Sequence, residues 1–122
     1  MANKLVHWEI VGPDGDELKA FYGNLFGWSY ESPPGFDDYH MVAAEQAGLG
    51  GAVGKGSDEM PNYVTLYIEV PDITAHLSRI EAAGGRTLMP RTVIPDTVTI
   101  GMFTDPSGNV IGLVESAHAE AE

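Results

Sequence analysis

The pattern of apolar and polar positions near the N-terminus predicts a strand followed by a helix. Residues 5–11 form an apolar run, and apolar residues then recur at Leu18, Phe21, Tyr22 and Leu25. This i, i+3, i+4, i+7 spacing is typical of one helical face. Asp14 is the expected N-cap of the helix, and Gly27 the expected residue that ends it. We therefore predict a strand over residues 4–11 and a helix over residues 14–26.

The same pattern returns 58 residues further along the chain. Residues 65–70 again form an apolar run, the dipeptide Pro71-Asp72 repeats Pro13-Asp14, and a second apolar helical face follows at Ile73, Leu77 and Ile80. In this register His7 aligns with Thr65. Two copies at this separation indicate a duplicated supersecondary unit rather than a solenoid.

The complete pattern predicts an α+β fold in which each unit is β-α-β-β-β. We expect one domain over residues 1–122, with unit one at about 4–54 and unit two at about 62–115. Further strands are expected at residues 28–31, 39–44, 48–54, 62–70, 86–94, 97–104 and 109–115, and a second helix at 72–83. One face of each four-stranded unit would lie under its helix. The two βαβββ repeats would form a curved mixed sheet around a cleft, with the helices outside.

The charge of the chain limits its partners. Eighteen acidic residues against six basic ones give a net charge of −12. This balance argues against nucleic acid and against anionic membrane surfaces, because both require basic patches. There is no cysteine, and no segment has the pattern of a signal peptide or a membrane span. We therefore expect a cytoplasmic protein.

Two segments carry a resemblance to a known family. FYGNLFGW follows the first strand, and FTDPSGNVIGLVE closes the second unit. Together with the element order, they resemble the vicinal oxygen chelate superfamily, which includes glyoxalases, extradiol dioxygenases, methylmalonyl-CoA epimerases and bleomycin resistance proteins. The resemblance covers residues from about 5 to 115. It implies a small-molecule site in the cleft and a homodimer, and whether units pair within a chain or swap between chains stays open.

The resemblance also implies which positions would hold a metal. In metal-using members the ligands come from the first and last strands of each unit, which here are the positions of His7, Gly51, Thr65 and Gly112. Only His7 can ligate a divalent metal well, since glycine has no side chain and a threonine hydroxyl is a poor ligand. We therefore predict no metal and no other cofactor, with a divalent metal as the alternative.

Strand alternation predicts which other side chains face the cleft. His7 would point inward with Glu9, and Thr65 with Tyr67 and Glu69. The remaining candidate ligand-binding residues flank or form two glycine gaps: Leu49, Gly51, Val53, Val110, Gly112 and Val114. Bare glycines in a strand would open a slot for a flat ligand. Tyr39 and Tyr63 are further candidates for ligand contact, because a phenol tolerates a half-wet cleft.

Three functions follow from these residues. The first is a metal-free protein that binds a small, flat, largely apolar molecule, uncharged or cationic because anions would meet repulsion. The second is an enzyme in which His7, Glu9 or Glu69 acts as an acid or base. The third is a metal-dependent lyase, isomerase or dioxygenase, which the ligand positions disfavour.

Overall fold

The computed structural model describes residues 2–34, 37–95 and 97–116. The chain divides into two compact units, and the division falls inside two strands, after Val6 and after Thr65. His7–Thr65 forms the N-terminal unit, and the rest of the described chain forms the C-terminal unit. Each unit is described by itself.

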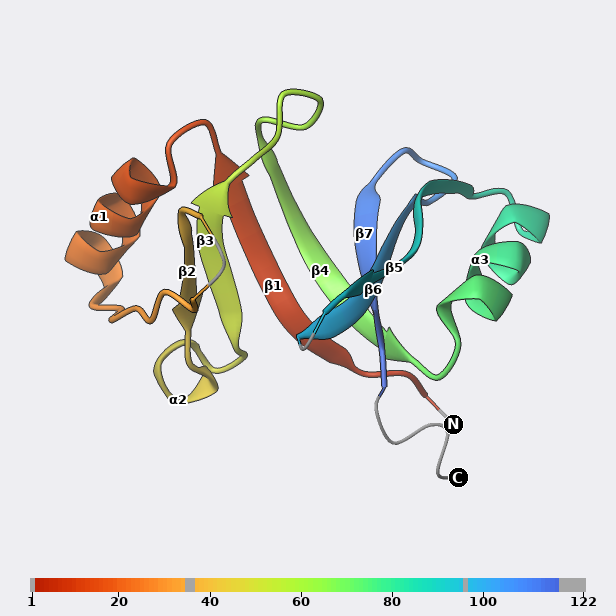
Figure 1. Ribbon diagram of the computed structural model, residues 1–122, viewed down its shortest axis with the longest axis horizontal. Helices are drawn as coiled ribbons and strands as arrows, with labels where there is room; N and C mark the ends of the chain where they lie inside the picture. The colour runs from red at the N-terminus through yellow and green to blue at the C-terminus, as the bar shows by residue number, and fades with distance from the viewer. Residues whose placement is uncertain (1, 35–36, 96, 117–122) are drawn as a thin grey trace. The chain divides into compact units, whose positions relative to one another are not determined.

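The N-terminal unit is built around three strands and one long helix. Its elements are β1 (Leu5–Gly12, from His7 onward), α1 (Gly15–Phe26), β2 (Tyr39–Val42), the short helix α2 (Ala44–Ala47) and β3 (Gly51–Lys55). The strand order is β2-β3-β1, with β1 parallel and β2 antiparallel to β3. Helix α1 lies against β3 and β2 (Figure 1).

The C-terminal unit has four strands and one helix. Its elements are β4 (Tyr63–Val70, from Leu66 onward), α3 (Ile73–Ala82), β5 (Arg86–Ile94), β6 (Val98–Thr104) and β7 (Val110–Glu115). The order is β4-β7-β6-β5, with β4 parallel to β7 and the other pairs antiparallel. Helix α3 packs beside β5 and β6 (Figure 1).

These elements confirm the predicted α+β fold of two related units, each with a mixed sheet. The predicted strand at residues 28–31 is wrong, because only Glu31 makes an isolated bridge, to Met41. Pro33 and Pro34 follow it, and proline cannot donate to a strand ladder. The strand expected at 48–54 begins at Gly51, after the unpredicted helix α2.

Both long helices begin as the sequence predicts. The carboxylate of Asp14 accepts a hydrogen bond from Glu17 N at 3.1 Å, and that of Asp72 accepts one from Ala75 N at 3.0 Å. Gly27 ends α1 in the left-handed region, with φ of 75°, where a side chain would be strained. No helix of the described residues is long and apolar enough to span a membrane.

The two helices bury their apolar faces to different extents. Under α3, Ile73 and Leu77 join Val70 and Leu113 in a buried core. On α1 the predicted apolar face is only partly buried, because Phe21 is 54% exposed, Leu25 is 61% exposed, and Tyr22 instead stacks on Trp28. The apolar face of α1 is therefore only partly covered by the sheet.

Candidate functional site

The register of β1 defines the two faces of the N-terminal unit. Trp8 pairs with Gly51 and Ile10 with Val53 in the parallel β1–β3 ladder. The ring of Trp8 lies 5.1 Å from that of Trp28, which stacks on Tyr22 of α1. Trp8, Ile10 and their β3 partners therefore face α1. The alternate residues of β1, including His7 and Glu9, face the opposite side, which we call the His7 face.

The slot predicted at the two glycines is wrong. A side chain at Gly51 would collide with the indole of Trp8, and one at Gly112 would collide with the ring of Tyr67. Each glycine thus makes room for an aromatic ring of the neighbouring strand, not for a ligand. Gly51 and Val53 also face α1 instead of sharing the His7 face, and the carbonyl of Leu49 accepts a hydrogen bond from Trp8 Nε1.

A buried carboxylate forms the centre of the His7 face. Glu9 is only 5% exposed. Its Oε2 accepts a hydrogen bond from the hydroxyl of Tyr39 and its Oε1 one from the hydroxyl of Tyr63, both at 2.7 Å. Phenol donors stabilise a carboxylate that has lost most of its water. The three residues come from three different strands, so the sheet itself fixes their geometry.

His7 extends this network. Its Nε2 lies 2.9 Å from the hydroxyl oxygen of Tyr39. Because the single hydroxyl hydrogen of Tyr39 is donated to Glu9, Nε2 of His7 must be the donor in this contact. The result is a chain of hydrogen bonds from His7 through Tyr39 to Glu9. In the neutral ring, Nδ1 is then the acceptor nitrogen.

Burial sets the protonation states of this network. Desolvation lowers the pKa of His7, and the negative charge of Glu9 opposes that shift only in part. The imidazole is therefore neutral near pH 7. Desolvation, the charge of Glu9 and the hydrogen bond to Glu9 all raise the pKa of Tyr63 far above its usual value, so its hydroxyl stays a donor. The His7 face thus offers neutral polar groups around one buried anion.

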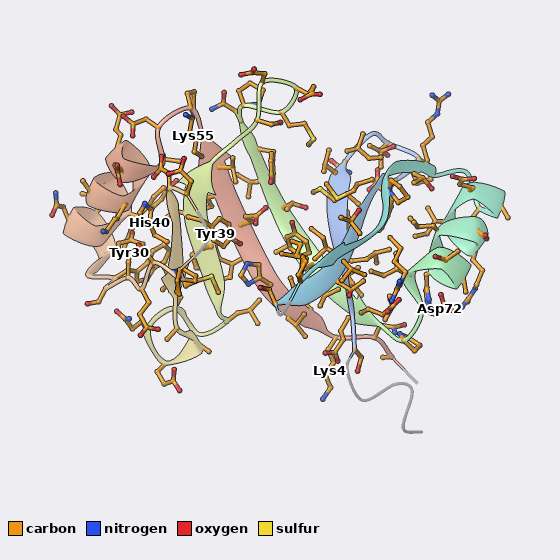
Figure 2. The ribbon with its side chains drawn as sticks, in the orientation of Figure 1. Lys4, Tyr30, Tyr39, His40, Lys55 and Asp72 are labelled. Carbon is orange, nitrogen blue, oxygen red and sulfur yellow. The ribbon has the colours of Figure 1, made fainter. Side chains whose placement is uncertain are left out.

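A second polar cluster lies on the α1 side of the N-terminal unit, and the sequence analysis missed it. His40 Nε2 is 2.9 Å from Asp38 Oδ1 and 3.2 Å from Asp16 Oδ1, and its Nδ1 contacts Ser32 Oγ at 2.7 Å. Figure 2 shows His40 toward α1 and Tyr39, its neighbour in β2, on the other side. The available signal was the spacing of two residues between Asp38, just before β2, and His40 within it.

The His40 cluster has ligand types that suit a divalent metal. One atom each from Asp16, Asp38 and His40 lies within 4.8 Å of the others. A hydrogen bond between His40 Nε2 and Asp38 Oδ1 already engages two of these atoms, and Asp38 Oδ2 accepts another hydrogen bond from Gly15 N at 2.9 Å. The cluster fastens the start of α1 to β2, and it is a possible metal position.

The residues of the His7 face do not fit the metal site that the resemblance implies. Gly51 faces α1 and lies on the other side of the sheet. The β3 residues on the His7 face are Ala52 and Gly54, and neither has a side chain that could bind a metal. Nε2 of His7 carries a proton, and both oxygens of Glu9 accept phenol hydrogen bonds. The absence of a metal at His7 stays a prediction, since only a measurement tests it.

The remaining candidates lie at buried or half-buried positions. Thr65 is 2% exposed and Tyr67 is 5% exposed. The backbone N–H of Glu69 donates to the carbonyl of Lys4 at 2.9 Å. The structure does not place Glu69, Val110 and Val114 of the C-terminal unit relative to His7. Their part in a shared site therefore stays a prediction, as does the cleft.

Two related units, each with a mixed sheet and a helix packed on it, define the fold class of this chain. A family model for the Glyoxalase/Bleomycin resistance protein/Dioxygenase superfamily matches residues 4–113. The chain belongs to this superfamily, which confirms the family predicted from the sequence.

Two curated relatives share sequence with this chain. The proteins named "Putative glyoxylase CFP32" from Mycobacterium bovis and Mycobacterium tuberculosis are each 33% identical to it over 111 residues. The match covers 86% of this chain and 42% of each relative. The chain thus spans less than half the length of these relatives.

Solved structures share the fold at low identity. A hypothetical protein from Bacillus halodurans matches with a TM-score of 0.67 and 14% identity, over 95% of this chain and 96% of its own. Methylmalonyl-CoA epimerase from Mycobacterium tuberculosis matches with a TM-score of 0.64 and 20% identity, over 96% of this chain and 90% of its own. At these identities the likeness shows the fold alone.

Proposed function

We propose that this chain binds a small, largely apolar organic molecule on the His7 face of its N-terminal unit. The ligand is uncharged or cationic, and no metal at His7 takes part. The observation that carries this proposal is the network of His7, Tyr39, Glu9 and Tyr63, in which half-buried polar groups surround a buried carboxylate. A few convergent polar groups beside apolar surface are the usual composition of a ligand site.

Apolar neighbours support the largely apolar character of the ligand. Met41 of β2 pairs with Ala52 of β3, and both lie on the same face as Tyr39 and Glu9. His7, Tyr39 and Tyr63 contribute a few polar groups, one imidazole and two hydroxyls, that could bind polar atoms of the ligand. The slot that favoured a flat ligand is filled by Trp8, so flatness is no longer part of the proposal.

Charge supports the choice of a neutral or cationic ligand. Glu9 is a buried anion that accepts hydrogen bonds from two neutral phenols. A ligand carboxylate or phosphate beside it would add a second negative charge in a poorly screened site. The net charge of −12 adds repulsion during approach.

A screen by thermal shift and ligand-observed NMR tests the proposal. The library holds matched sets of aromatic amines, alcohols and carboxylates that share one apolar body. We expect hits among amines and alcohols, and we expect Glu9→Gln to weaken the amines more than the alcohols. A hit list made up chiefly of carboxylates, phosphates or coenzyme A esters would contradict it.

A second candidate function is acid–base catalysis at His7. The chain from His7 through Tyr39 to Glu9 supports it, because a proton taken up by the neutral ring creates an imidazolium that Tyr39 and Glu9 stabilise. Incubating each hit with the protein and analysing the products by mass spectrometry tests this function. We expect His7→Asn to abolish turnover while binding persists, and turnover that survives in His7→Asn would exclude His7 as the base.

We further propose that the chain forms a homodimer. Phe21, Leu25 and Phe26 of α1 are each more than half exposed, and together they form an apolar patch of a kind often covered by a partner. Sedimentation velocity at micromolar concentration tests this proposal. A single monomeric species would contradict it.

A further inference from the structure

A groove on the N-terminal unit lies on the α1 side of β1 and borders the His7 face at Tyr63. It encloses about 390 Å³ between the start of α1 and the start of β4. Its lining includes Ile10, Gly12, Pro13, Leu18, Asn62 and Val64. Ile10 and Gly12 belong to the α1 side of β1, since a side chain at Gly12 would contact Leu18 at 3.1 Å. The volume falls within the range of roughly 300–1,000 Å³ that is usual for small-molecule pockets.

The walls of the groove are apolar. Leu18 of α1 and Ile10 of β1 face it, together with Val64 of β4. Val64 is 70% exposed, so its side chain is available for contact with a ligand in the groove. An apolar ligand would cover this side chain without disturbing the core of either unit.

The rim of the groove is acidic. Asp14 and Glu17 both line it, and no lysine or arginine of the described residues does so. The N-terminus of α1 carries a partial positive charge of about half a unit, which is smaller than the two formal negative charges beside it. The groove therefore attracts cations.

We infer that this groove binds an organic ammonium ion with an apolar body, such as an arylalkylamine. The ammonium group would lie between Asp14 and Glu17, and the apolar body against Leu18 and Val64. The inference goes beyond the proposed function, because the ammonium group and the apolar body would lie on the α1 side of β1. Tyr63 connects the two regions, since it lines the groove while its hydroxyl donates to Glu9.

An NMR titration with three probes of the same shape tests the inference. ¹⁵N-labelled protein is titrated with 2-phenylethylamine, 2-phenylethanol and 3-phenylpropanoate, and amide shifts are followed. We expect affinity to decrease from amine to alcohol to carboxylate, with the largest shifts at residues 10–18 and 62–64. Shifts at Met41 and Ala52 would instead report binding on the His7 face, so the two proposals can fail separately.

Charge variants isolate the role of the rim. Asp14→Asn keeps a side-chain oxygen that caps α1, and Glu17→Gln keeps the shape of its side chain. We expect the double variant to weaken the amine roughly three- to tenfold and to leave the alcohol unchanged, as for partly exposed charge pairs. Glu45→Gln on α2 is the matched control and should change neither.

Two results would overturn the inference. The first is equal affinity for the amine and the carboxylate, and the second is an unchanged amine affinity in the double variant. The exposed Val64 gives an independent check at little cost to folding. Val64→Ala should weaken both the amine and the alcohol, and an unaltered affinity for both would remove the groove as the site.

Discussion

The two units share one framework but carry different chemistry on the strand faces opposite their helices. In both units an aspartate caps the long helix, at Asp14 and at Asp72. The residue 58 positions after Glu9 is Tyr67, whose ring lies over Gly112. The N-terminal unit thus has a buried carboxylate where the C-terminal unit has an aromatic ring. The duplicated framework supports the fold in both halves, whereas the polar network is specific to one.

The helix sides differ as well. Under α3, aliphatic side chains form a buried core around Ile73 and Leu77. Beside α1, the rings of Trp8, Tyr22 and Trp28 pack together, while Leu25 stays 61% exposed. We conclude that the C-terminal unit derives more of its stability from its helix than the N-terminal unit does.

The largest expected effect compares one leucine from each helix. Leu77→Ala should lower the free energy of unfolding by about 2–4 kcal/mol, because it leaves a cavity in the core under α3. Leu25→Ala, the same change at an exposed site, should cost less than about 1 kcal/mol. Urea denaturation measures both. Equal losses would contradict the difference between the helix sides.

The next effect concerns the two glycines under aromatic rings. Gly51→Ala must displace Trp8, and Gly112→Ala must displace Tyr67, so each should cost about 1–3 kcal/mol of stability. Combining Gly51→Ala with Trp8→Ala should remove much of the cost, which a double-mutant cycle detects. If Gly51→Ala has the same urea midpoint of unfolding as the wild type, Trp8 does not cover the glycine.

The helix caps should respond alike in the two units. Asp14→Ala and Asp72→Ala each remove a carboxylate that accepts a backbone hydrogen bond, at a cost of about 1 kcal/mol. Asparagine at either position keeps an acceptor and should cost much less. Thermal denaturation of the four variants measures this. A loss of stability for only one of the two alanine variants would contradict the equivalence of the two caps.

The smallest effect is a pH dependence from His7. Burial lowers the pKa of His7 in the folded state, so the unfolded chain binds its proton more readily. Stability should therefore fall as the pH drops below the unfolded pKa of about 6.5 toward the lower folded pKa. Urea unfolding at several pH values should show a weaker loss for His7→Asn than for wild type. His76→Asn on α3 is the control, and a slope unchanged in His7→Asn would contradict burial of the neutral ring.

Sequence reasoning was most successful where the chemistry is local. The caps at Asp14 and Asp72 and the end of α1 at Gly27 depend on neighbouring residues, and the structure confirms them. The 58-residue repeat also predicted the order of the long elements, because the second copy repeats the local pattern of the first. The prediction of a strand at residues 28–31 was wrong because strand pairing needs a partner strand in register, and a local pattern does not specify that partner.

The site was only partly predictable. Alternation along β1 correctly placed His7 and Glu9 on one face, but the β3 register was not in the sequence, so Gly51 was assigned to the wrong side. The rings over Gly51 and Gly112 depend on packing across strands and could not be deduced from one strand alone. The His40 cluster joins residues from α1 and β2, and no local spacing connects Asp16 to His40.

Metal analysis sharpens the comparison of the two polar clusters of the N-terminal unit. We expect that no stoichiometric metal depends on His7, because the His7 face lacks a set of metal ligands. Plasma mass spectrometry of purified protein, with His40→Ala in parallel, makes the measurement. A bound metal that depends on His7 would refute the metal-free proposal, and one that depends on His40 would locate it at the other cluster.

The most direct test of the central claim compares two phenols on opposite faces of the N-terminal unit. Tyr39 joins His7 to Glu9, whereas the buried hydroxyl of Tyr30 on the α1 side has no hydrogen-bond partner among the described residues. Calorimetric titration with the best neutral hit of the screen measures affinity for wild type, Tyr39→Phe and Tyr30→Phe. We expect Tyr39→Phe to bind about tenfold more weakly, the loss of one hydrogen bond worth about 1.4 kcal/mol, and Tyr30→Phe to bind like wild type. Equal affinity of Tyr39→Phe and wild type would contradict the assignment of ligand binding to the His7 face.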